Sequence, residues 1–507
     1  MKLLKNLFIL DMANNHQGSL AHGSKIINEH SKVIKKYGVD AAIKFQFRDL
    51  DTFIHKSHQS ESEDPMVNRF LSTRLEPEDY QILFELCKKN QLKTICTPFD
   101  EKSVDLIVEM GFDLIKVASA SAKDWPLLEK VAKSGLPVVF STGGLIIKDI
   151  DNIISFFNHR AVDISIMHCV SIYPTPDEEI HLNQIDYLIK RYPGVNIGWS
   201  THEDPNDTTP VIMAVAKGAQ IFERHIGIET SEIKLNKYSS TPLQIDNWLK
   251  AYQKANVING LAPRLIPQAE KDALDSLRRG VFVKSDLKKG DVLTFQNTYF
   301  ATPYEQGQLS SDHWKEGIKL NISLSADTSI NLKDVSIPKM PDWQILKESI
   351  HEIKALLNYA GVDIGSDFDA EFSHHYGIKK FRETGTTIVN CINREYCKKI
   401  LIQLPGQFHP SHFHKRKEET FQILYGTLDS SKDGRDYVLN PGDTLLVKPG
   451  IWHSFSSQNG CVFEEVSTTH FLNDSVYQDQ YIMSQSVEQR KTKVMNWGRF
   501  ELLENND

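Results

Sequence analysis

Short apolar runs recur along the first 225 residues, and segments with helical spacing lie between them. Two such segments, 76–90 (EPEDYQILFELCKKN) and 124–134 (DWPLLEKVAKS), place apolar residues three or four positions apart, as an amphipathic helix does. A strand followed by a helix, eight times over, is typical of a closed (β/α)8 barrel. The eight runs are 7–10 (LFIL), 41–45 (AAIKF), 93–96 (KTIC), 113–118 (DLIKVA), 137–140 (PVVF), 164–167 (ISIM), 195–199 (VNIGW) and 219–222 (AQIF).

The rest of the chain changes character twice. A helical stretch runs to about residue 258, and residues 276–337 then read as the short strands and turns of a small β-rich module. Residues 338–345 (PKMPDWQI) carry two prolines and are predicted to be a linker. The remainder opens with a predicted helix (LKESIHEIKALLNYA) and becomes strand-rich. The pattern predicts three domains, at residues 1–262, 276–337 and 346–507.

Composition narrows the class of protein. Of the 507 residues, 40% are hydrophobic and 24% are charged, which is ordinary for a globular protein. The net charge of −8 comes without a long basic run and argues against a nucleic-acid partner. No segment approaches ~20 apolar residues, and the first run breaks at Asp11, so we expect neither a membrane span nor a signal peptide. Six scattered cysteines without a CxxC pair favour reduced thiols and a cytoplasmic protein.

Polar side chains follow nearly every predicted strand, at the rim where (β/α)8 barrels carry their sites. Lys44 and Lys116 interrupt apolar runs, and burial in the barrel mouth would require an anionic partner such as a phosphate or carboxylate ligand. The alternative is that either lysine reaches solvent. His202 and His225 follow neighbouring strands, and two imidazoles with a carboxylate and water suit a divalent cation such as Mn²⁺ or Zn²⁺. A hydrogen-bonded structural role is the alternative for this pair.

The first two thirds of the chain resembles the sialic acid synthase family in the order and spacing of eight motifs. The motifs are DMANNHQG (11–18), IKFQ (43–46), CTPFD (96–100), IKVAS (115–119), STGG (141–144), SIYPTP (171–176), GWSTH (198–202) and ERH (223–225). Residues 276–337, which open with RRGVFVKSDLKKGDVL, resemble the antifreeze-like (SAF) domain of that family. The resemblance spans roughly residues 5–337 and implies a TIM barrel followed by a small SAF β-clip domain.

The resemblance implies that phosphoenolpyruvate condenses with an aldose, here a modified aminosugar, to a nonulosonic (sialic-acid-like) α-keto acid. Asp11 and His225 would be the catalytic pair, and His202 and His225 would hold a divalent metal, Mn or Mg. A homodimer in which the SAF domain reaches the partner's barrel is also implied. The alternative is a sugar-binding or scaffold protein with an inactive barrel. By position, the substrate-binding residues would be Lys44, Gln46, Thr97, Lys116, Ser119, Ser141, Tyr173 and Ser200.

Departures from the family pattern fall mainly on the side of the acceptor sugar. Asp11 replaces the usual glutamate, and Ser171 replaces an asparagine near the phosphate. Ser121 stands where the family has a glutamate that contacts the acceptor, and Thr302 stands where the SAF domain has an arginine. Because the phosphoenolpyruvate side is largely kept, we expect a synthase with a different acceptor, either a modified aminosugar of the legionaminic or pseudaminic kind or one that lacks the usual N-acetyl contact.

A second constellation lies near the carboxyl terminus. Residues 406–426 fit the spacing G-x5-HxH-x4-E-x6-G, and 441–455 (PGDTLLVKPGIWHSF) adds a histidine. These are the two motifs of cupins, which residues 365–480 resemble, and they supply His412, His414, Glu419 and His453. Histidines two apart on a strand point to the same face. Three imidazoles and one carboxylate with open positions suit a divalent Mn, Fe, Zn or Ni ion.

The role of this predicted metal is open, mainly between two functions, with oxidative chemistry as a third alternative. The surrounding sequence is similar to sugar-isomerase cupins, in which a divalent ion and a proton-transfer group interconvert an aldose and a ketose. Candidates for the proton shuttle are Lys417, Glu464 and Glu465. The alternative is a metal-stabilised sugar-binding module that performs no chemistry.

Overall fold

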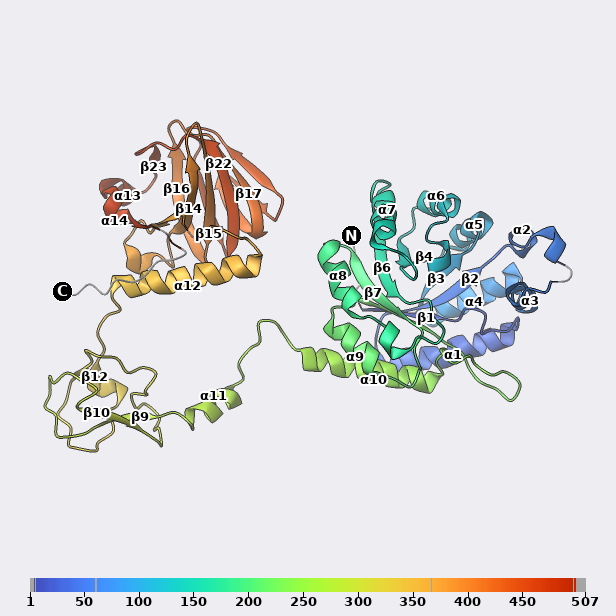
Figure 1. The fold of residues 1–507 in the computed structure, drawn as a ribbon, viewed down its shortest axis with the longest axis horizontal. Coiled ribbons are helices and arrows are strands. Elements are labelled where there is room, and N and C mark those ends of the chain that lie inside the picture. Colours follow the sequence, from blue (N-terminus) through green and yellow to red (C-terminus); the bar gives the residue numbers. More distant parts are fainter. Residues whose placement is uncertain (1–3, 5, 60–61, 366, 496, 498–507) are drawn as a thin grey trace. The chain divides into compact units, whose positions relative to one another are not determined.

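The structure is a computed structural model that describes residues 4, 6–59, 62–365, 367–495 and 497 (Figure 1). By its internal contacts the chain divides into two compact units, residues 1–266 and 267–507. The first unit holds a barrel, and the second holds a small β-rich module followed by a cupin fold.

Eight parallel strands close into a barrel in the first unit, in the order of the sequence. Each strand is a nearly continuous apolar run because both of its faces are covered, one by the barrel interior and one by helices. All eight predicted runs are strands, so the predicted (β/α)8 barrel is confirmed. The strands are β1 (Leu7–Asp11), β2 (Ala41–Phe47), β3 (Lys93–Pro98), β4 (Leu114–Val117), β5 (Val138–Ser141), β6 (Ile164–Cys169), β7 (Asn196–Thr201) and β8 (Ile221–His225).

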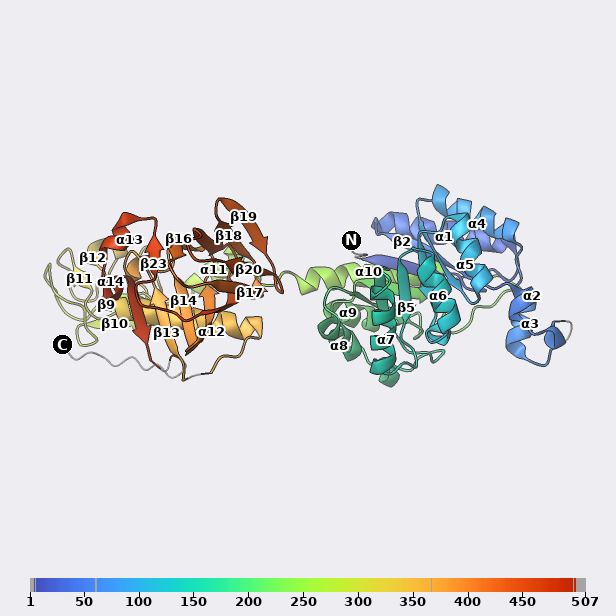
Figure 2. The same ribbon diagram turned by 90° about the horizontal axis from the view of Figure 1, so that it is seen from above.

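Helices surround these strands (Figures 1 and 2), and local sequence signals set their ends. The first begins after Ser19, whose hydroxyl accepts a hydrogen bond from the backbone N–H of His22. It ends at Gly38, whose φ of 62° is the left-handed conformation that glycine adopts without strain. No helix among the described residues is both long and apolar enough to cross a membrane. The helices are α1 (Leu20–Tyr37), α2 (Leu50–Phe53), α3 (Pro65–Ser72), α4 (Pro77–Lys89), α5 (Glu101–Met110), α6 (Trp125–Lys133), α7 (Ile147–Asn158), α8 (Asn183–Arg191), α9 (Thr209–Ala216) and α10 (Pro242–Asn259).

Buried apolar side chains plug the barrel interior toward the amino ends of the strands. This interior floor is a cluster separate from the larger core between the strands and the helices. The floor consists of Leu7, Ile9, Ala42, Ile95, Leu114, Val139, Met167 and Ile221. Polar side chains in the barrel must therefore lie above this floor, toward the carboxyl ends of the strands.

The second unit opens with α11 (Gln268–Asp275) and the small β-rich module. In this module β9 (Gly280–Val283) pairs with β10 (Thr298–Ala301), and β11 (Lys319–Leu320) pairs with β12 (Val335–Ser336), both antiparallel. Its own core of buried aliphatic side chains includes Val281, Leu309 and Ile330. The predicted β-rich character of residues 276–337 is confirmed, whereas its identification as an SAF domain stays a prediction.

The predicted linker 338–345 is wrong in its second half. The helix α12 (Asp342–Ala360) begins directly after Pro341, inside the stretch that was expected to be irregular. Proline fixes φ at a helix-compatible value and lacks the N–H that a helix start leaves unpaired, so it marks the beginning of this helix. The prolines therefore separate the small module from α12, and the linker is shorter than predicted.

Two antiparallel sheets, one of seven strands and one of five, enclose the core of the cupin. Helix α12 covers the outer face of the seven-stranded sheet, where Ile350 and Ile353 join the same cluster as Ile402. Sheet order is β20-β17-β22-β15-β14-β13-β24 in the larger sheet and β19-β18-β21-β16-β23 in the smaller. The elements are β13 (Asp369–Ser373), β14 (Thr386–Asn393), β15 (Tyr396–Gln403), β16 (Gln407–His414), β17 (Glu419–Gly426), β18 (Leu428–Lys432), β19 (Arg435–Leu439), β20 (Thr444–Val447), β21 (His453–Ser457), β22 (Cys461–Thr468), β23 (Ser475–Tyr477), α13 (Gln480–Ser484), α14 (Val487–Arg490) and β24 (Lys491–Val494).

Candidate active site and candidate metal centre

A layer of polar side chains lies directly above the apolar floor of the barrel. Side chains two positions apart on a strand face the same way, so Leu114 in the floor of β4 is followed by Lys116 in this layer. The same step from Ile221 on β8 reaches Glu223. The polar layer is Asp11, Lys44, Thr97, Lys116, Ser141, Cys169, Ser200 and Glu223, and all eight are buried.

Glu223 is the centre of this layer. Its Oε1 lies 3.0 Å from Nζ of Lys44 and 3.4 Å from Nζ of Lys116, and it accepts a 2.8 Å hydrogen bond from Oγ of Ser200. Nζ of Lys44 also lies 2.9 Å from Oδ2 of Asp11, so Lys44 has a second carboxylate partner besides Glu223. Burial by itself would raise the pKa of Glu223, but the ammonium groups of Lys116 and Lys44 hold that pKa well below its usual range. The layer is therefore an ionised network of two cations and two anions.

His202 and His225 lie side by side above the network, with ring centroids 5.3 Å apart. Nδ1 of His202 is 3.0 Å from the carbonyl oxygen of Val170, which can only accept, so Nε2 carries the free lone pair. Nδ1 of His225 is 3.3 Å from Oδ2 of Asp11. Burial lowers the pKa of His225 to about 4, which keeps the imidazole neutral at physiological pH. Two neutral imidazoles beside a carboxylate fit a divalent cation.

The network and the histidine pair open into one cavity of about 660 Å³ at the barrel mouth. Of the predicted barrel site residues, all but Thr97 line it: Asp11, Lys44, Gln46, Lys116, Ser119, Ser141, Tyr173, Ser200, His202 and His225. Thr97 is buried behind this surface, and its hydroxyl has no hydrogen-bond partner among the described residues. The geometry therefore brings together nearly the whole predicted set, while the role of each residue stays a prediction.

Sequence reasoning missed several residues that line the cavity. Glu223 belonged to a quoted motif, and alternation from Ile221 could have placed it inside the barrel. Arg48 directly follows β2 and could have been found at this strand end, whereas Arg69 lies on α3 and has no such signal. Cζ of Arg48 lies 3.6 Å from the ring centroid of Phe99, a stacking contact that local sequence does not reveal. Ser171, the departure near the expected phosphate, lines the cavity, whereas Ser121, a departure on the acceptor side, does not.

The four predicted cupin ligands form a compact cage. One potential ligand atom from each of His412, His414, Glu419 and His453 lies within 4.8 Å of all the others, and all four residues are buried. The fold builds this cage from three strands: β16 supplies two histidines, β17 supplies the carboxylate, and His453 of β21 stands opposite His412 in the register. Their convergence confirms the predicted grouping.

Hydrogen bonding shows why this cage fits a metal ion. Nδ1 of His412 and Nδ1 of His453 each lie 3.1 Å from a backbone carbonyl oxygen, which fixes Nδ1 as the donor and leaves Nε2 as an acceptor. Nε2 of His453 then faces Oε1 of Glu419 at 2.8 Å, so two acceptors meet without a hydrogen between them. Asp474 stands behind His414, with Oδ2 3.6 Å from Nδ1. Inward lone pairs with outward hydrogen bonds are the usual arrangement of histidine metal ligands.

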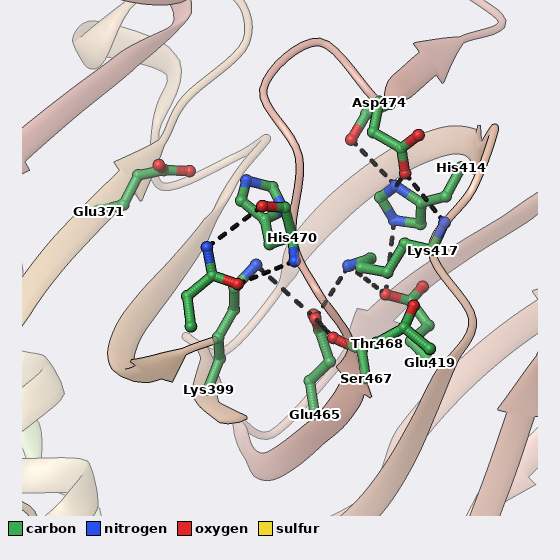
Figure 3. Close-up of polar contacts among 12 residues, drawn as sticks. Glu371, Lys399, His414, Lys417, Glu419, Glu465, Ser467, Thr468, His470 and Asp474 are labelled. Atoms are coloured by element: carbon green, nitrogen blue, oxygen red, sulfur yellow. Dashed lines mark hydrogen bonds and ion pairs between the residues drawn. The ribbon is translucent and has the colours of Figure 1, made fainter. Parts of the chain in front are cut away.

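A chain of buried charges leads away from the cage (Figure 3). Figure 3 shows Lys417 between two carboxylates, with Nζ 2.5 Å from Oε2 of Glu419 and 2.8 Å from Oε1 of Glu465. Lys399 lies beyond, with Nζ 3.7 Å from the same Glu465 oxygen. The proposal of Glu464 as a proton shuttle is wrong, because alternation along β22 turns it to the opposite face, where it pairs with Lys398 at 3.1 Å. Lys417 and Glu465 line the cavity and remain candidates for the proton shuttle.

The cage and the charge chain line a cavity of about 520 Å³. Its floor is aromatic, formed by Phe421 and Phe455, and the cage residues Glu419 and His453 lie two positions before them on the same strands. Sequence reasoning missed Lys399, Tyr477 and Arg490, which also line this cavity. The last comes from α14, a short helix after the last motif, so no motif spacing could have pointed to it.

Fold and site together define a class of protein: a (β/α)8 barrel with an ionic cavity at its mouth, followed by a cupin with a metal cage. The NeuB family model matches residues 32–261, and a cupin domain model matches residues 400–462. Together with the relatives below, this shows that the chain belongs to the NeuB family.

Three known proteins are similar to this chain. A crystal structure from Chromobacterium violaceum, provisionally named spore coat polysaccharide biosynthesis protein E, is 43% identical with a TM-score of 0.64 and covers 66% of this chain and 100% of its own. An uncharacterised protein of Methanocaldococcus jannaschii is 32% identical over 57% of this chain and 82% of its own length. The N,N'-diacetyllegionaminic acid synthase of Legionella pneumophila is 23% identical over 64% of this chain and 92% of its own length.

Proposed function

We propose that the barrel condenses phosphoenolpyruvate with an aldose to give a nonulosonic α-keto acid. One observation carries this proposal: the cavity is lined by four cationic side chains but only two carboxylates, those of Asp11 and Glu223. An anionic ligand would balance the excess, and phosphoenolpyruvate brings a phosphate and a carboxylate. Similarity to a legionaminic acid synthase supports the same reaction class. The cations are Lys44, Arg48, Arg69 and Lys116.

The two lysines have hydrogen-bonding capacity left for such a ligand. An ammonium group offers three donors. Lys44 contacts Asp11 and Glu223, and Lys116 contacts Glu223 and Oγ of Ser141 at 2.6 Å, so each keeps one N–H for the phosphate or carboxylate. Because these donors are held in place before substrate arrives, they would stabilise the negative charge of the departing phosphate without rearrangement.

Asp11 is suited to move a proton in this reaction. We propose that the enol carbon C3 attacks the aldehyde, water then adds at C2, and the carboxylate of Asp11 accepts the proton of that water. Its position, 2.9 Å from Nζ of Lys44 and 3.3 Å from Nδ1 of His225, puts it between the proposed anion site and the histidine pair. A divalent metal held by His202 and His225 would polarise the aldehyde carbonyl when bound.

The acceptor sugar is proposed to differ from that of typical sialic acid synthases. By the resemblance, Ser121 and Thr302 stand where the family has a glutamate and an arginine that contact the acceptor. Asp11 carries a side chain one carbon shorter than glutamate, which leaves more room beside His225. We therefore propose an aminosugar acceptor of the legionaminic or pseudaminic kind.

A turnover assay tests the condensation. The full chain with Mn²⁺ is given phosphoenolpyruvate and a panel of N-acetylated hexosamines, and phosphate release and product mass are measured. We expect release only in the presence of both substrates, with a product whose mass equals aldose plus pyruvate. Chelation should abolish release. If no aldose on the panel supports release and phosphoenolpyruvate does not bind, the barrel is a binding or scaffold module instead.

A second candidate function concerns the cupin, which we propose acts as a sugar isomerase or epimerase. Lys417 supports it, because its ammonium joins the cage carboxylate Glu419 to Glu465 and could pass a proton between them. Exchange of sugar C–H hydrogens in D2O, followed by NMR, measures this chemistry directly. Loss of exchange in Glu465→Gln with retained sugar binding supports catalysis, whereas binding without exchange in the wild-type protein leaves a sugar-binding module.

A homodimer with exchanged SAF domains is the remaining proposal from the resemblance. The last ten residues of the first unit include exposed apolar side chains, among them Val257, Leu261 and Leu265, which are suited to a protein interface. Light scattering during size-exclusion chromatography measures the mass. A mass near 57.8 kDa would contradict the dimer.

A further inference from the structure

Arg490 is a buried guanidinium without an acidic partner. It is 8% exposed and lines the cupin cavity, and its Nε and Nη1 atoms have no hydrogen-bond partner among the described residues. A guanidinium does not lose its charge on burial, so an unpaired one is costly unless a ligand satisfies it. This arginine therefore points to an anion that binds in the cavity.

The acidic side chains nearest to this part of the cavity are already engaged. Oε1 of Glu371 lies 2.5 Å from Nζ of Lys491, the residue that follows Arg490. Glu465 accepts from Lys417 at 2.8 Å and has Lys399 beside it. Among the described residues, no carboxylate forms an ion pair with Arg490.

The charge of the whole cavity favours an anionic ligand as well. The lining carries five cationic and four acidic side chains before any metal is bound. A divalent ion in the cage would add two positive charges. The cations are Lys399, Lys417, Arg490, Lys491 and Lys493, and the acids are Asp369, Glu371, Glu419 and Glu465.

Tyr477 connects the arginine to the metal cage. Its ring centroid is 5.2 Å from the ring centroid of His412 and 5.2 Å from Cζ of Arg490, and all three residues line the same cavity. The guanidinium and the cage thus flank one aromatic surface. A ligand of the size of a hexose that lies along this ring would reach both.

We propose that the cupin cavity binds an anionic polyol, with its oxyanion on Arg490 and its hydroxyl groups toward the His412, His414, Glu419 and His453 cage. The planar fork of a guanidinium matches the two oxygens of a carboxylate, so a sugar acid is the simplest ligand of this class, and a sugar phosphate shares the chemistry. This inference does not depend on the reaction of the barrel. The α-keto acid proposed as the barrel product belongs to the same class, and that link does rest on the proposed function.

The test is a binding measurement on the full chain loaded with Mn²⁺. Calorimetry compares gluconate with sorbitol, which have the same carbon skeleton but differ in one carboxylate, and sorbitol 6-phosphate provides the phosphate. We expect an oxyanion-bearing probe to bind more tightly than sorbitol, and Arg490→Met to weaken it about 10- to 100-fold, the range of a lost charge-assisted hydrogen-bond pair. The affinity for sorbitol should not change. Whichever oxyanion shows the larger loss identifies carboxylate or phosphate as the natural group.

Two controls separate this result from general damage. Arg490→Lys keeps the charge but not the fork, so an intermediate affinity is expected. Arg435→Met removes an exposed arginine from the same fold and should leave binding unaltered. Any binding of the probe to the barrel lysines would be the same in the wild type and in these cupin variants. Failure of the barrel proposal therefore does not change the comparison of their affinities. Equal affinity for gluconate in wild type and Arg490→Met, no binding of either oxyanion, or equal affinity for sorbitol and both oxyanions would overturn the proposal.

Discussion

The barrel and the cupin build their sites by the same rule and reach opposite arrangements of charge. In each, an apolar floor fills the interior, and a residue two positions away on the same strand carries the chemistry. This residue follows the floor residue in the barrel and precedes it in the cupin. The barrel takes one polar residue from each of eight strands and joins two lysines and two carboxylates in one ionic network at its mouth. The cupin gathers four ligands within 4.8 Å. A network of both charge signs beside an open cavity suits an anionic substrate, whereas a compact cage of ligand atoms suits a single ion.

The largest expected effect is on the barrel's ionic network. Lys116→Met removes one of the two ammonium groups that face Glu223, so both an anion donor and a neutralising partner are lost. We expect condensation to fall by about 10²- to 10³-fold or more, the usual loss when one preorganised donor of charge stabilisation is removed. Steady-state phosphate release measures it.

The matched control for this variant is Lys123→Met. Lys123 is 59% exposed in its side chain and lies 3.5 Å from Asp149 on the outside of the barrel. Its removal should leave turnover unaltered. A Lys116→Met protein that keeps the wild-type rate contradicts the view that the buried lysines are the anion site.

The next effect is on the cupin cage. Glu419→Gln removes its only carboxylate ligand and leaves Lys417 with one acidic partner fewer. We expect metal affinity to fall by at least about 100-fold, beyond the loss typical of outer partners of a metal ligand. Metal analysis after dialysis measures the bound ion. The neighbouring Glu418, which is exposed, provides the control Glu418→Gln. If Glu419→Gln retains stoichiometric metal, the cage is not the site.

The barrel and the cupin each contain a glycine whose position leaves no room for a side chain. A Cβ added at Gly198 in β7 would lie 2.5 Å from the carbonyl oxygen of Ile221, inside the barrel wall. At Gly426 it would clash with the carbonyl of Gly460, at a φ of 76°. Each Gly→Ala change should cost about 1–3 kcal/mol of unfolding free energy, because packed backbone cannot move aside. Calorimetry should show Gly198→Ala lowering the barrel transition alone and Gly426→Ala lowering the transition that metal stabilises. Coupled shifts of both transitions would show that the units unfold together.

Sequence reasoning predicted the parts of this molecule that repeat or have fixed spacing. The barrel strands and the cupin ligands follow from alternation and from motif distances, which are local properties. Arg490 was missed because its place near Tyr477 depends on how distant segments pack. Arg48 directly follows β2, but its stacking on Phe99 is not visible in the local sequence. Pro341 misled the linker prediction, since a proline that interrupts one element can begin the next.

The smallest expected effect is on the pH dependence of the unfolding free energy of the barrel. His30 in α1 is fully buried, and Nδ1 lies 2.9 Å from the carbonyl oxygen of Ile26. Burial lowers its pKa from 6.5 to about 4. Between these pH values the histidine is protonated in the unfolded chain and neutral in the folded barrel. The resulting stability is complete above pH 6.5 and is lost as pH falls toward 4. At pH 5.5 the loss should be about 1 kcal/mol relative to pH 7.5, and His30→Gln should remove that much of the pH dependence. Urea unfolding at both pH values measures it, with exposed His159→Gln as the control. A pH dependence that is the same in His30→Gln and in the wild type would show that other buried histidines govern the acid response of the barrel.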